Sequence, residues 1–320
     1  MKRLRIVFMG TAAFAVPTLQ RLFEEGYPIV AVNTQPDKPS GRGQSFQASP
    51  VKRKALELHL NVHQPASLKN DQARLLFQAL EPELIVVVAY GKIIPPWLIE
   101  LPRHGVVNLH GSLLPRYRGA APIQWAIASG ESETGVCTMR IDEGLDTGPV
   151  YSCEKTAIGP DESADELAQR LAHTGAELMK RTIDGIASGA LKPTPQDHSQ
   201  ATLAPILRRQ DGYIDWTETA QAIHNRIRGF NPWPGAVTRF RQSLCKLLKS
   251  KVGLGTEASV PPGGIIATKR SLAVVCGDTR ILEVLEVQVH NRKPLSGKDF
   301  VNGFRIQPGE KFERVTDNDV

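Results

Sequence analysis

Residues 84–89 read Leu-Ile-Val-Val-Val-Ala, a continuous apolar run with three consecutive valines. β-branched residues favour strands, and a strand in which every side chain is apolar is typical of a parallel sheet that is covered on both faces. Parallel strands need long crossover connections, which are usually helices. The run therefore predicts an α/β domain.

The N-terminal residues fit the same architecture. Residues 4–9 and 29–33 are strand-like, and residues 14–25 between them have the apolar period of an amphipathic helix. This order predicts a right-handed crossover and a Rossmann-like, mostly parallel sheet. The first turn holds one glycine, Gly10, so the dinucleotide fingerprint with three glycines is absent and we reject a nicotinamide or flavin enzyme.

The rest of the first half continues the pattern. The runs 135–141 and 148–156 are strand-like, and their short connection predicts that they pair antiparallel at the far side of the sheet. A long helix is predicted at 163–188, with Asp165 and Glu166 in its first turn. Further helices are expected at residues 51–60, 71–80 and 122–129.

The second half has a different composition. Residues 190–205 are rich in Pro, Gln, Ser and Thr and show no apolar period, so we place a linker at 190–207. It separates an α/β domain of residues 1–189 from a second domain of residues 208–320. There a helix at 217–228 precedes short strand-like runs divided by glycine and proline, which predicts a small oligonucleotide-binding (OB-like) β-barrel. These runs are 236–240, 246–252, 264–268, 272–276 and 281–289.

The segment 105–119, GVVNLHGSLLPRYRG, carries the chemistry. It begins as a buried strand and ends in polar residues, and strand ends that lead into glycine-containing loops are ligand sites in α/β sheets. Asn108 and His110 are two residues apart, so on a strand they point the same way and can together polarise a carbonyl and move a proton. They can also simply cap a strand. The dense run of rigid and cationic residues after Ser112 favours the functional interpretation.

Residues 108–119, Asn-Leu-His-Gly-Ser-Leu-Leu-Pro-Arg-Tyr-Arg-Gly, resemble the signature of formyltransferases that use 10-formyltetrahydrofolate. Residues 142–148 are similar to the Asp-x-Gly-x-Asp-Thr-Gly segment of the same family. The resemblance implies a catalytic trio of Asn108, His110 and Asp146, and a reaction that requires no metal. It also implies a folate site formed by Ser112, Leu113, Leu114 and Pro115, with Val88, Ala89, Tyr90 and Gly91 around the pterin ring.

Each member of the trio has a chemical role in formyl transfer. Asn108 can donate its amide N–H to the tetrahedral oxyanion. His110 can stabilise the same oxygen or carry a proton, and a carboxylate at Asp146 would fix its tautomer. Without the resemblance, Asp146 between Gly144 and Gly148 would be interpreted as a turn residue.

The loop 34–50 is long for a compact domain and contains Lys38 and Arg42. Loops of this length are functional or are simply surface segments. The resemblance implies that this loop engages the acceptor end of transfer RNA. Two features depart from the family pattern: Ala12-Ala13 replace a proline and an acidic residue, and residues 44–48 read Gln-Ser-Phe-Gln-Ala instead of more basic residues. We therefore hypothesise that Phe46 stacks on an opened base.

Positive charge is concentrated in the second half. The net charge of +6 lies entirely in residues 206–320, which hold 18 basic and 12 acidic residues. This asymmetry suggests a polyanionic partner, although a basic surface that only confers solubility would look the same. The residues that we predict to contact RNA phosphates there are Arg208, Arg226, Arg228, Arg239, Lys246 and Lys249.

Two further stretches of sequence indicate which molecule accepts the formyl group. Residues 226–235 and 297–312 resemble the start and the end of the C-terminal domain in the branch of the family that acts on methionyl-tRNA. The expected function is therefore formylation of initiator methionyl-tRNA by a cytoplasmic, monomeric enzyme. A formyltransferase for nucleotide-sugar amines, a hydrolase of the formyl donor, and an inactive nucleic-acid binder remain alternatives. The basic second half disfavours the first two, and the intact trio disfavours the third.

Several aromatic residues and the cysteines are expected to have structural roles. Phe230 and Trp233, with the prolines beside Trp233, are expected to form a plug at the interface between the two domains. The four widely spaced cysteines, at 137, 153, 245 and 276, suggest neither a zinc site nor a disulfide framework and are expected to be small buried hydrophobes. No apolar tract approaches the length of a membrane span, and the N-terminus lacks a signal-peptide pattern.

Overall fold

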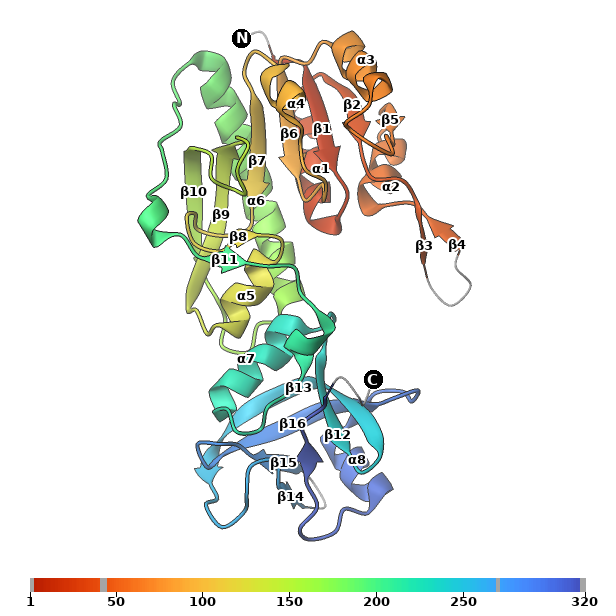
Figure 1. The fold of residues 1–320 in the computed structure, drawn as a ribbon, viewed down its shortest axis with the longest axis vertical. Helices are drawn as coiled ribbons and strands as arrows, with labels where there is room; N and C mark the ends of the chain where they lie inside the picture. The colour runs from red at the N-terminus through yellow and green to blue at the C-terminus, as the bar shows by residue number, and fades with distance from the viewer. Residues whose placement is uncertain (1–2, 41–44, 269–270, 317–320) are drawn as a thin grey trace. The chain divides into compact units, whose positions relative to one another are not determined.

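The computed structural model describes residues 3–40, 45–268 and 271–316 (Figure 1). The chain forms two compact units, and each is composed of several segments. Part of the segment that we expected to be a linker, up to Ala204, belongs to the first unit. Unit 1 comprises Met1–Pro122, Thr134–Thr156 and Ala168–Ala204, and unit 2 comprises Ile123–Glu133, Ala157–Leu167 and Pro205–Val320.

Unit 1 is built on a seven-stranded sheet with the strand order β10-β9-β7-β6-β1-β2-β5. The five strands from β7 to β5 are parallel, and β9 is antiparallel to β7, which confirms the Rossmann-like, mostly parallel sheet. The strands are β1 (Ile6–Gly10), β2 (Ile29–Asn33), β5 (Val62–His63), β6 (Leu84–Val88), β7 (Val106–His110), β9 (Glu133–Arg140) and β10 (Val150–Ala157).

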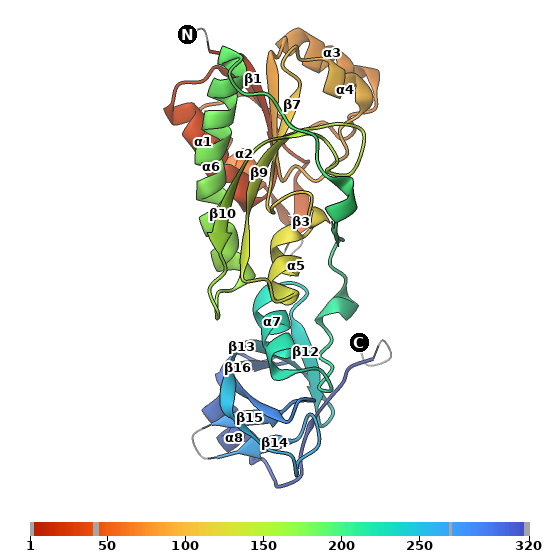
Figure 2. The ribbon, with the colours of Figure 1, turned by 90° about the vertical axis from the view of Figure 1, so that its left-hand side faces the viewer.

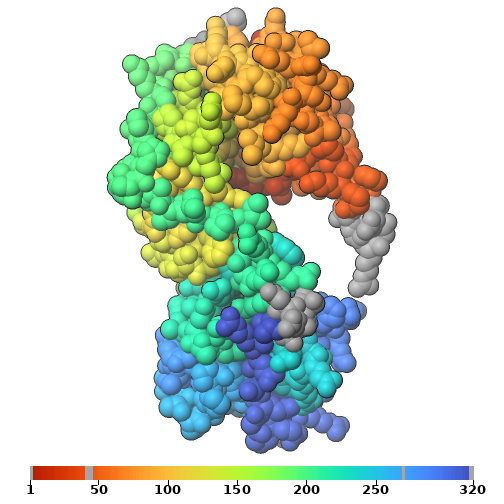
Figure 3. Space-filling view, viewed as in Figure 1, coloured from red at the N-terminus to blue at the C-terminus, as the bar shows by residue number. Residues whose placement is uncertain are grey.

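Helices cover both faces of this sheet, as the all-apolar strands β1 and β6 require (Figure 2). On one face lie α1 (Val16–Glu24), α2 (Pro50–Glu57) and α6 (Ala164–Ser188), and on the other lie α3 (Asp71–Leu80) and α4 (Pro96–Glu100). Phe77 and Leu98 anchor α3 and α4 with no exposed surface. The space-filling view shows side chains closed over this part of the sheet (Figure 3).

Several short elements could not be predicted from the sequence, because two or three residues are too few to show a hydrophobic period. The loop 34–50 contains an antiparallel hairpin of β3 (Lys38–Ser40) and β4 (Ser45–Gln47), whereas Arg42 lies outside the described residues. In the expected linker, β11 (Leu203–Ala204) pairs with β8 (Arg118–Gly119). The 3-10 helices of unit 1 are η1 (Ala13–Ala15) and η2 (His198–Gln200).

Unit 2 contains an antiparallel sheet with the strand order β14-β15-β16-β13-β12-β18. A bridge between Gly264 and Lys311 joins the two ends of this order, so the sheet curls back on itself as an OB-like domain. The strands are β12 (Ala236–Phe240), β13 (Ser243–Thr256), β14 (Ile265–Ala267), β15 (Leu272–Val275), β16 (Arg280–Val289), β17 (Leu295–Ser296) and β18 (Phe312–Glu313).

Helices and aromatic side chains complete unit 2. Thr219 caps α7 (Ala220–Phe230) by accepting a hydrogen bond from the Ala222 N–H, and Ser296 caps α8 (Gly297–Phe304), which the sequence patterns did not predict. Phe240, Phe300 and Phe312 pack within 6 Å of one another in the core. The remaining helices, both short, are α5 (Pro122–Ala128) and η3 (Arg209–Gly212).

Two interpretations of apolar residues need correction. Phe230 is fully buried, with its ring 5.3 Å from that of Trp125, but Trp233 is 56% exposed and does not form part of a plug. Cys245 and Cys276 are buried free thiols as expected, whereas Cys137 and Cys153 form a disulfide between β9 and β10. A spacing of 16 residues did not indicate the bond because the register of the two strands cannot be derived from the sequence.

No helix in the described part of the chain combines the length and the apolar character needed to cross a membrane.

Candidate active site

Strand β7 presents two polar side chains among buried apolar ones. Val106, Val107 and Leu109 are buried, whereas Asn108 is half-buried and His110, at the carboxyl end, is 5% exposed. Side chains alternate between the faces of a strand, so Asn108 and His110 project from the same face. The structure thus confirms the strand end on which the predicted pair depends.

His110 lies between a carbonyl and a carboxylate. Its Nε2–H donates to the Tyr117 carbonyl at 2.9 Å, and its Nδ1 is 3.7 Å from Oδ2 of Asp146. The same carboxylate oxygen accepts a hydrogen bond from the Gly119 N–H at 2.8 Å. The structure therefore brings the predicted residues His110 and Asp146 together, with Asp146 held by the main chain of the signature segment.

The connection between β9 and β10 positions Asp146. Asp146 has a φ of +51°, in the left-handed region that Asp tolerates better than most residues. Oδ1 of Asp142 accepts from the Thr147 hydroxyl at 2.7 Å and from the Gly144 N–H at 3.1 Å. At Gly148 a Cβ would stand 1.9 Å from the Arg140 carbonyl oxygen, so only glycine fits there.

Gln196, from the expected linker, supports the same loop. Its amide nitrogen donates to the carbonyl of Asp146 at 2.9 Å and to that of Gly148 at 2.6 Å, and its oxygen accepts from Arg118 at 2.7 Å. It is 9% exposed. The sequence offered no signal for this role, because the composition of the segment suggested a solvated connection.

The segment after His110 is closely packed. Ser112 is fully buried and donates its hydroxyl to the Arg116 carbonyl at 2.6 Å, while Leu114 and Pro115 are half-buried. A Cβ at Gly135 would lie 2.6 Å from Cδ2 of Leu113, so β9 passes directly beneath this side chain. Three of the four predicted folate residues of this segment thus have partly exposed side chains next to His110.

The second predicted folate segment follows β6. Val88 and Tyr90 are buried, whereas Ala89 and Gly91 are exposed and have positive φ angles of 44° and 77°. The Gln35 amide donates to the carbonyls of Tyr90 and Gly91 at 2.8 and 3.0 Å. Burial raises the pKa of Tyr90 to about 12, so its hydroxyl stays protonated. Exposed main chain beside buried apolar side chains suits a flat heterocycle with amide-like edges.

In the described ranges no group of three or more His, Cys, Asp or Glu side chains is arranged to hold a metal ion.

Three of the six basic residues predicted for RNA contact in unit 2 are paired with acidic residues. Arg226 binds Glu218 through two nitrogens at 3.0 and 3.2 Å, and Arg239 lies 2.9 Å from Glu313. Lys249 is 4.0 Å from Glu286. These cations are already partly neutralised within the fold.

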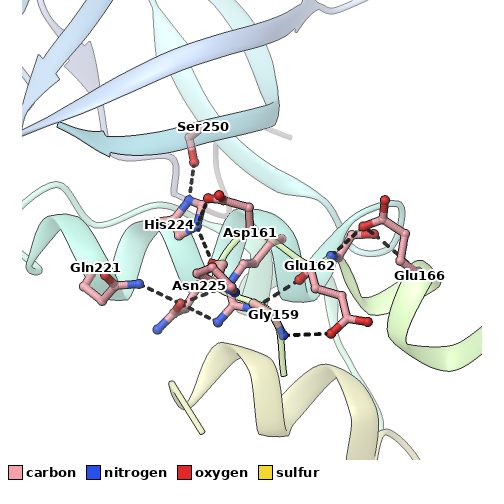
Figure 4. Close-up of polar contacts among 11 residues, drawn as sticks. Gly159, Asp161, Glu162, Glu166, Gln221, His224, Asn225 and Ser250 are labelled. Atoms are coloured by element: carbon pink, nitrogen blue, oxygen red, sulfur yellow. Dashed lines mark hydrogen bonds and ion pairs between the residues drawn. The ribbon is translucent and has the colours of Figure 1, made fainter. Parts of the chain in front are cut away.

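Arg228 is 8% exposed and lies at a cavity of about 460 Å³ that is also lined by Asp161, His224 and Lys251. Its guanidinium donates to Oδ1 of Asn225 and to the carbonyls of Gly159 and Glu162. His224 beside it bonds Ser250 at 2.9 Å, and Figure 4 shows this network of α7 and residues 159–166. The placement argues against the RNA contact predicted for Arg228.

Other cations are directed to the surface. Lys38 on β3 and Arg208 are exposed, and Lys246 is half-buried. Exposed cations that sequence analysis did not select surround α8, and within the described ranges no acidic side chain pairs with them. A count of basic residues beyond 251 would have found them. They are Arg292, Lys293, Lys298 and Arg305.

Family comparisons cover almost the whole chain. Residues 4–183 match the family model described as formyl transferase, and residues 206–305 match the model described as formyl transferase, C-terminal domain. The gap between the two models, 184–205, includes Gln196 and β11.

Individual relatives agree. The methionyl-tRNA formyltransferase of Solibacter usitatus is 48% identical over 97% of this chain and 98% of its own length, and that of Geobacter metallireducens is 47% identical over 97% and 98%. An N-formyltransferase from Helicobacter canadensis, crystallised with folinic acid and dTDP-3-aminofucose, shares the fold with a TM-score of 0.67 at 20% identity, covering 90% of this chain and 100% of that one. The chain belongs to the methionyl-tRNA formyltransferase family.

Proposed function

We propose that the chain transfers the formyl group of 10-formyltetrahydrofolate to the amino group of initiator methionyl-tRNA. The observation that carries the proposal is the contact of His110 with Asp146 at the end of β7, two residues after Asn108. Relatives with nearly half of their residues in common bear the name of this activity. The exposed cations of unit 2 supply the charge that an RNA acceptor needs.

Asn108 stabilises the oxyanion that forms when the amine attacks the formyl carbon. Its amide is fixed by a strand whose neighbours Val107 and Leu109 are buried, so little reorganisation is needed in the transition state. A preorganised donor of this kind lowers the barrier by about 3–4 kcal/mol.

His110 and Asp146 handle the proton. The attacking amine loses a proton and the departing folate nitrogen gains one, so a group near both must accept and release it. The Nε2–H of His110 is held by the Tyr117 carbonyl, and its Nδ1 faces Asp146. Asp146 in turn fixes the orientation of the ring, because its own carboxylate is anchored by the Gly119 N–H.

The folate lies against the two segments that flank β7. Leu113, Leu114 and Pro115 offer partly exposed apolar surface, and the main chain at Ala89 and Gly91 offers hydrogen-bonding groups. These groups match the apolar faces and polar edges of a pterin. The fit requires no metal, and the formyl donor supplies only the one-carbon group.

The RNA contacts come from the β3–β4 hairpin and from unit 2. Lys38 and Phe46 project from the hairpin, where Phe46 is 74% exposed. Arg42, predicted for the same contact, is outside the described residues. In unit 2 the exposed Arg208, Lys298 and Arg305 are available to phosphates without breaking an ion pair. Arg226, Arg239, Lys246 and Lys249 contribute less, because they are paired or partly buried.

The proposed setting is the cytoplasm, where charged tRNA is used in translation, and the proposed working form is a monomer. Light scattering at the concentrations used for assays measures the latter directly.

The test is an acceptor competition. The purified chain is mixed with 10-formyltetrahydrofolate and either methionyl-tRNA or a nucleotide-linked amino sugar, and the formylated product is identified by mass spectrometry. Formylated methionyl-tRNA is expected. Transfer to the sugar alone, or consumption of the donor without a formylated product, would overturn the proposed acceptor.

The hairpin contact has its own test. Phe46→Ala should lower kcat/KM for methionyl-tRNA by about tenfold, in line with the loss of one base–aromatic stack. Phe46→Trp should retain activity because it keeps a stacking face. An unchanged kcat/KM in Phe46→Ala would remove the stacking role.

A further inference from the structure

The disulfide between Cys137 and Cys153 is unequal in exposure. Cys137 on β9 has no exposed surface, whereas Cys153 on β10 is exposed at the edge of the sheet. The chain's two other cysteines are unlike this pair, because burial raises the pKa of Cys245 and of Cys276 to about 12 and keeps both as thiols. Only the pair in unit 1 therefore offers a sulfur to an external thiolate.

The bond also has a particular position relative to the active site. In the antiparallel register of β7 and β9, Cys137 is directly opposite His110, so both side chains project from the same face. Asp146 lies in the connection between β9 and β10, inside the loop of 16 residues that the disulfide closes. One cysteine of the bond is therefore the strand neighbour of His110, and the loop that the bond closes contains Asp146.

We propose that the Cys137–Cys153 disulfide is a thiol-exchange site whose oxidised form holds in place the hairpin of β9 and β10, whose connection contains Asp146. The reactant is a dithiol, either a small molecule or the active site of a dithiol reductase. Its thiolate attacks Sγ of the exposed residue Cys153, and Sγ of Cys137 leaves and takes up a proton. The second thiol of the reductant then resolves the mixed disulfide, so two electrons reduce the bond and the reductant becomes a disulfide.

Reduction alters the hairpin in a definite way. Two free sulfurs must move apart to van der Waals contact, and Cys137 has little room to move because it is fully buried opposite His110 of β7. The displacement therefore falls on Cys153 and the edge strand β10. The Asp146 loop keeps its bonds to Gly119 and Gln196, so it shifts rather than detaches.

The consequence for catalysis rests on the proposed function. Because a misplacement of 1 Å can lower a rate about 100-fold, a small shift of Asp146 relative to His110 should lower kcat by about threefold to tenfold. The KM for the formyl donor should stay within twofold, because the folate segments 88–91 and 112–115 lie outside the hairpin.

The experiment equilibrates the full chain in buffers with different ratios of reduced to oxidised dithiothreitol. Alkylation and peptide mass spectrometry count the free thiols, and formyl transfer to methionyl-tRNA is measured in parallel. The thiol count should rise from two to four, and kcat should fall with the same midpoint and recover on reoxidation. Cys153→Ser should show the low kcat at every ratio, while a Cys245→Ser/Cys276→Ser variant should respond like the unaltered chain.

Three outcomes would contradict the proposal. A count of four thiols at every ratio would show that the bond does not form in solution. A change in thiol count without a lower kcat in the reduced chain would separate the bond from catalysis. A parallel rise in KM with no change in kcat would place the effect on binding. Absence of formyl transfer at all ratios would instead count against the proposed function, since the thiol count is read without it.

Discussion

The active site of unit 1 and the basic surface of unit 2 hold their charged groups in different ways. In unit 1 main-chain groups anchor both members of the His110–Asp146 pair: the Tyr117 carbonyl accepts from His110, and the Gly119 N–H donates to Asp146. In unit 2 the partners are side chains, such as Glu218 on Arg226. A main-chain partner fixes a side chain in one place, whereas a surface ion pair is weak and can be exchanged for a phosphate. The active site of unit 1 thus depends on the fixed positions of its side chains, whereas the surface of unit 2 depends on its net positive charge.

The largest effect should come from Asn108, because geometry matters most at the oxyanion. Asn108→Ala removes the donor and should lower kcat by about 100-fold to 1,000-fold, with KM values within a few-fold of the original. Steady-state kinetics with both substrates varied measures the two constants separately. Asn302→Ala, an exposed position on α8, is the matched control.

A change in KM in place of kcat would show that Asn108 acts in substrate binding and not in the chemical step. If Asn108→Ala raised KM and left kcat unchanged, the amide would contribute equally to ground-state and transition-state binding. The contrast between the two units would then lose its main example, since unit 1 would also act chiefly through affinity.

A substitution of Gln196 tests whether a residue outside the signature segment 108–119 also holds the active site through main-chain hydrogen bonds. Gln196→Ala leaves the carbonyls of Asp146 and Gly148 without this donor and removes one acceptor of Arg118, which also donates to Nδ1 of His198. Each buried polar group left unpaired costs about 1–3 kcal/mol. We expect a loss of about 2–3 kcal/mol in the free energy of unfolding and about a tenfold lower kcat. Urea titration and kinetics measure the two effects.

Gln200→Ala is the control for that variant, because Gln200 is exposed and bonds only Asp197 nearby. If Gln196→Ala matched this control in both stability and kcat, residues 190–204 would behave as the simple linker that their composition suggested.

The same contrast explains what could be predicted from the sequence. Long apolar or periodic runs predicted the sheet of unit 1, because such runs depend on local spacing. The signature segment 108–119 predicted Asn108 and His110, and the family resemblance of residues 142–148 predicted Asp146. Gln196 could not be found, because its role depends on the path of a segment without a period. Nor could the pairing of Arg226 and Arg239, since a list of charges contains no information on which acid lies beside which base. The Cys137–Cys153 bond was missed for the related reason that it depends on strand register.

A smaller effect should distinguish exposed from paired cations in unit 2. Lys293→Gln/Lys298→Gln removes two exposed charges, whereas Arg226→Gln/Arg239→Gln removes two that face Glu218 and Glu313. The first variant should weaken tRNA binding by roughly fivefold to tenfold and reduce the slope of log K against log salt by about 1.5, because each phosphate contact contributes about 0.7–0.9. Filter binding across a salt series measures both quantities.

The paired variant should change the slope by less than half as much. Equal effects of the two variants would mean that Glu218 and Glu313 are displaced when tRNA binds. Arg226 and Arg239 would then contact phosphates in the complex even though they are paired in the free protein. Folate binding by unit 1 should be unaffected in both, and its loss would indicate misfolding.

The smallest effect concerns the stability of unit 2 at low pH. His224 is 4% exposed between Ser250 and the Pro160 carbonyl, and burial lowers its pKa below the ordinary 6.5. Arg228 beside it also lowers this pKa, while the hydrogen bond to the Pro160 carbonyl and the charge of Asp161 oppose the shift. The unfolded chain therefore takes up a proton below pH 6.5 that the folded chain refuses, and stability falls as the pH is lowered through that value by at most about 1.4 kcal/mol per pH unit. His224→Asn should flatten this dependence in thermal melts between pH 7 and pH 5, and exposed His290→Gln should not. If both variants kept the full dependence of stability on pH, the acid sensitivity would arise from other groups. The hydrogen bonds of His224 in unit 2 would then contribute as little to this dependence as the main-chain groups that anchor His110 and Asp146 in unit 1.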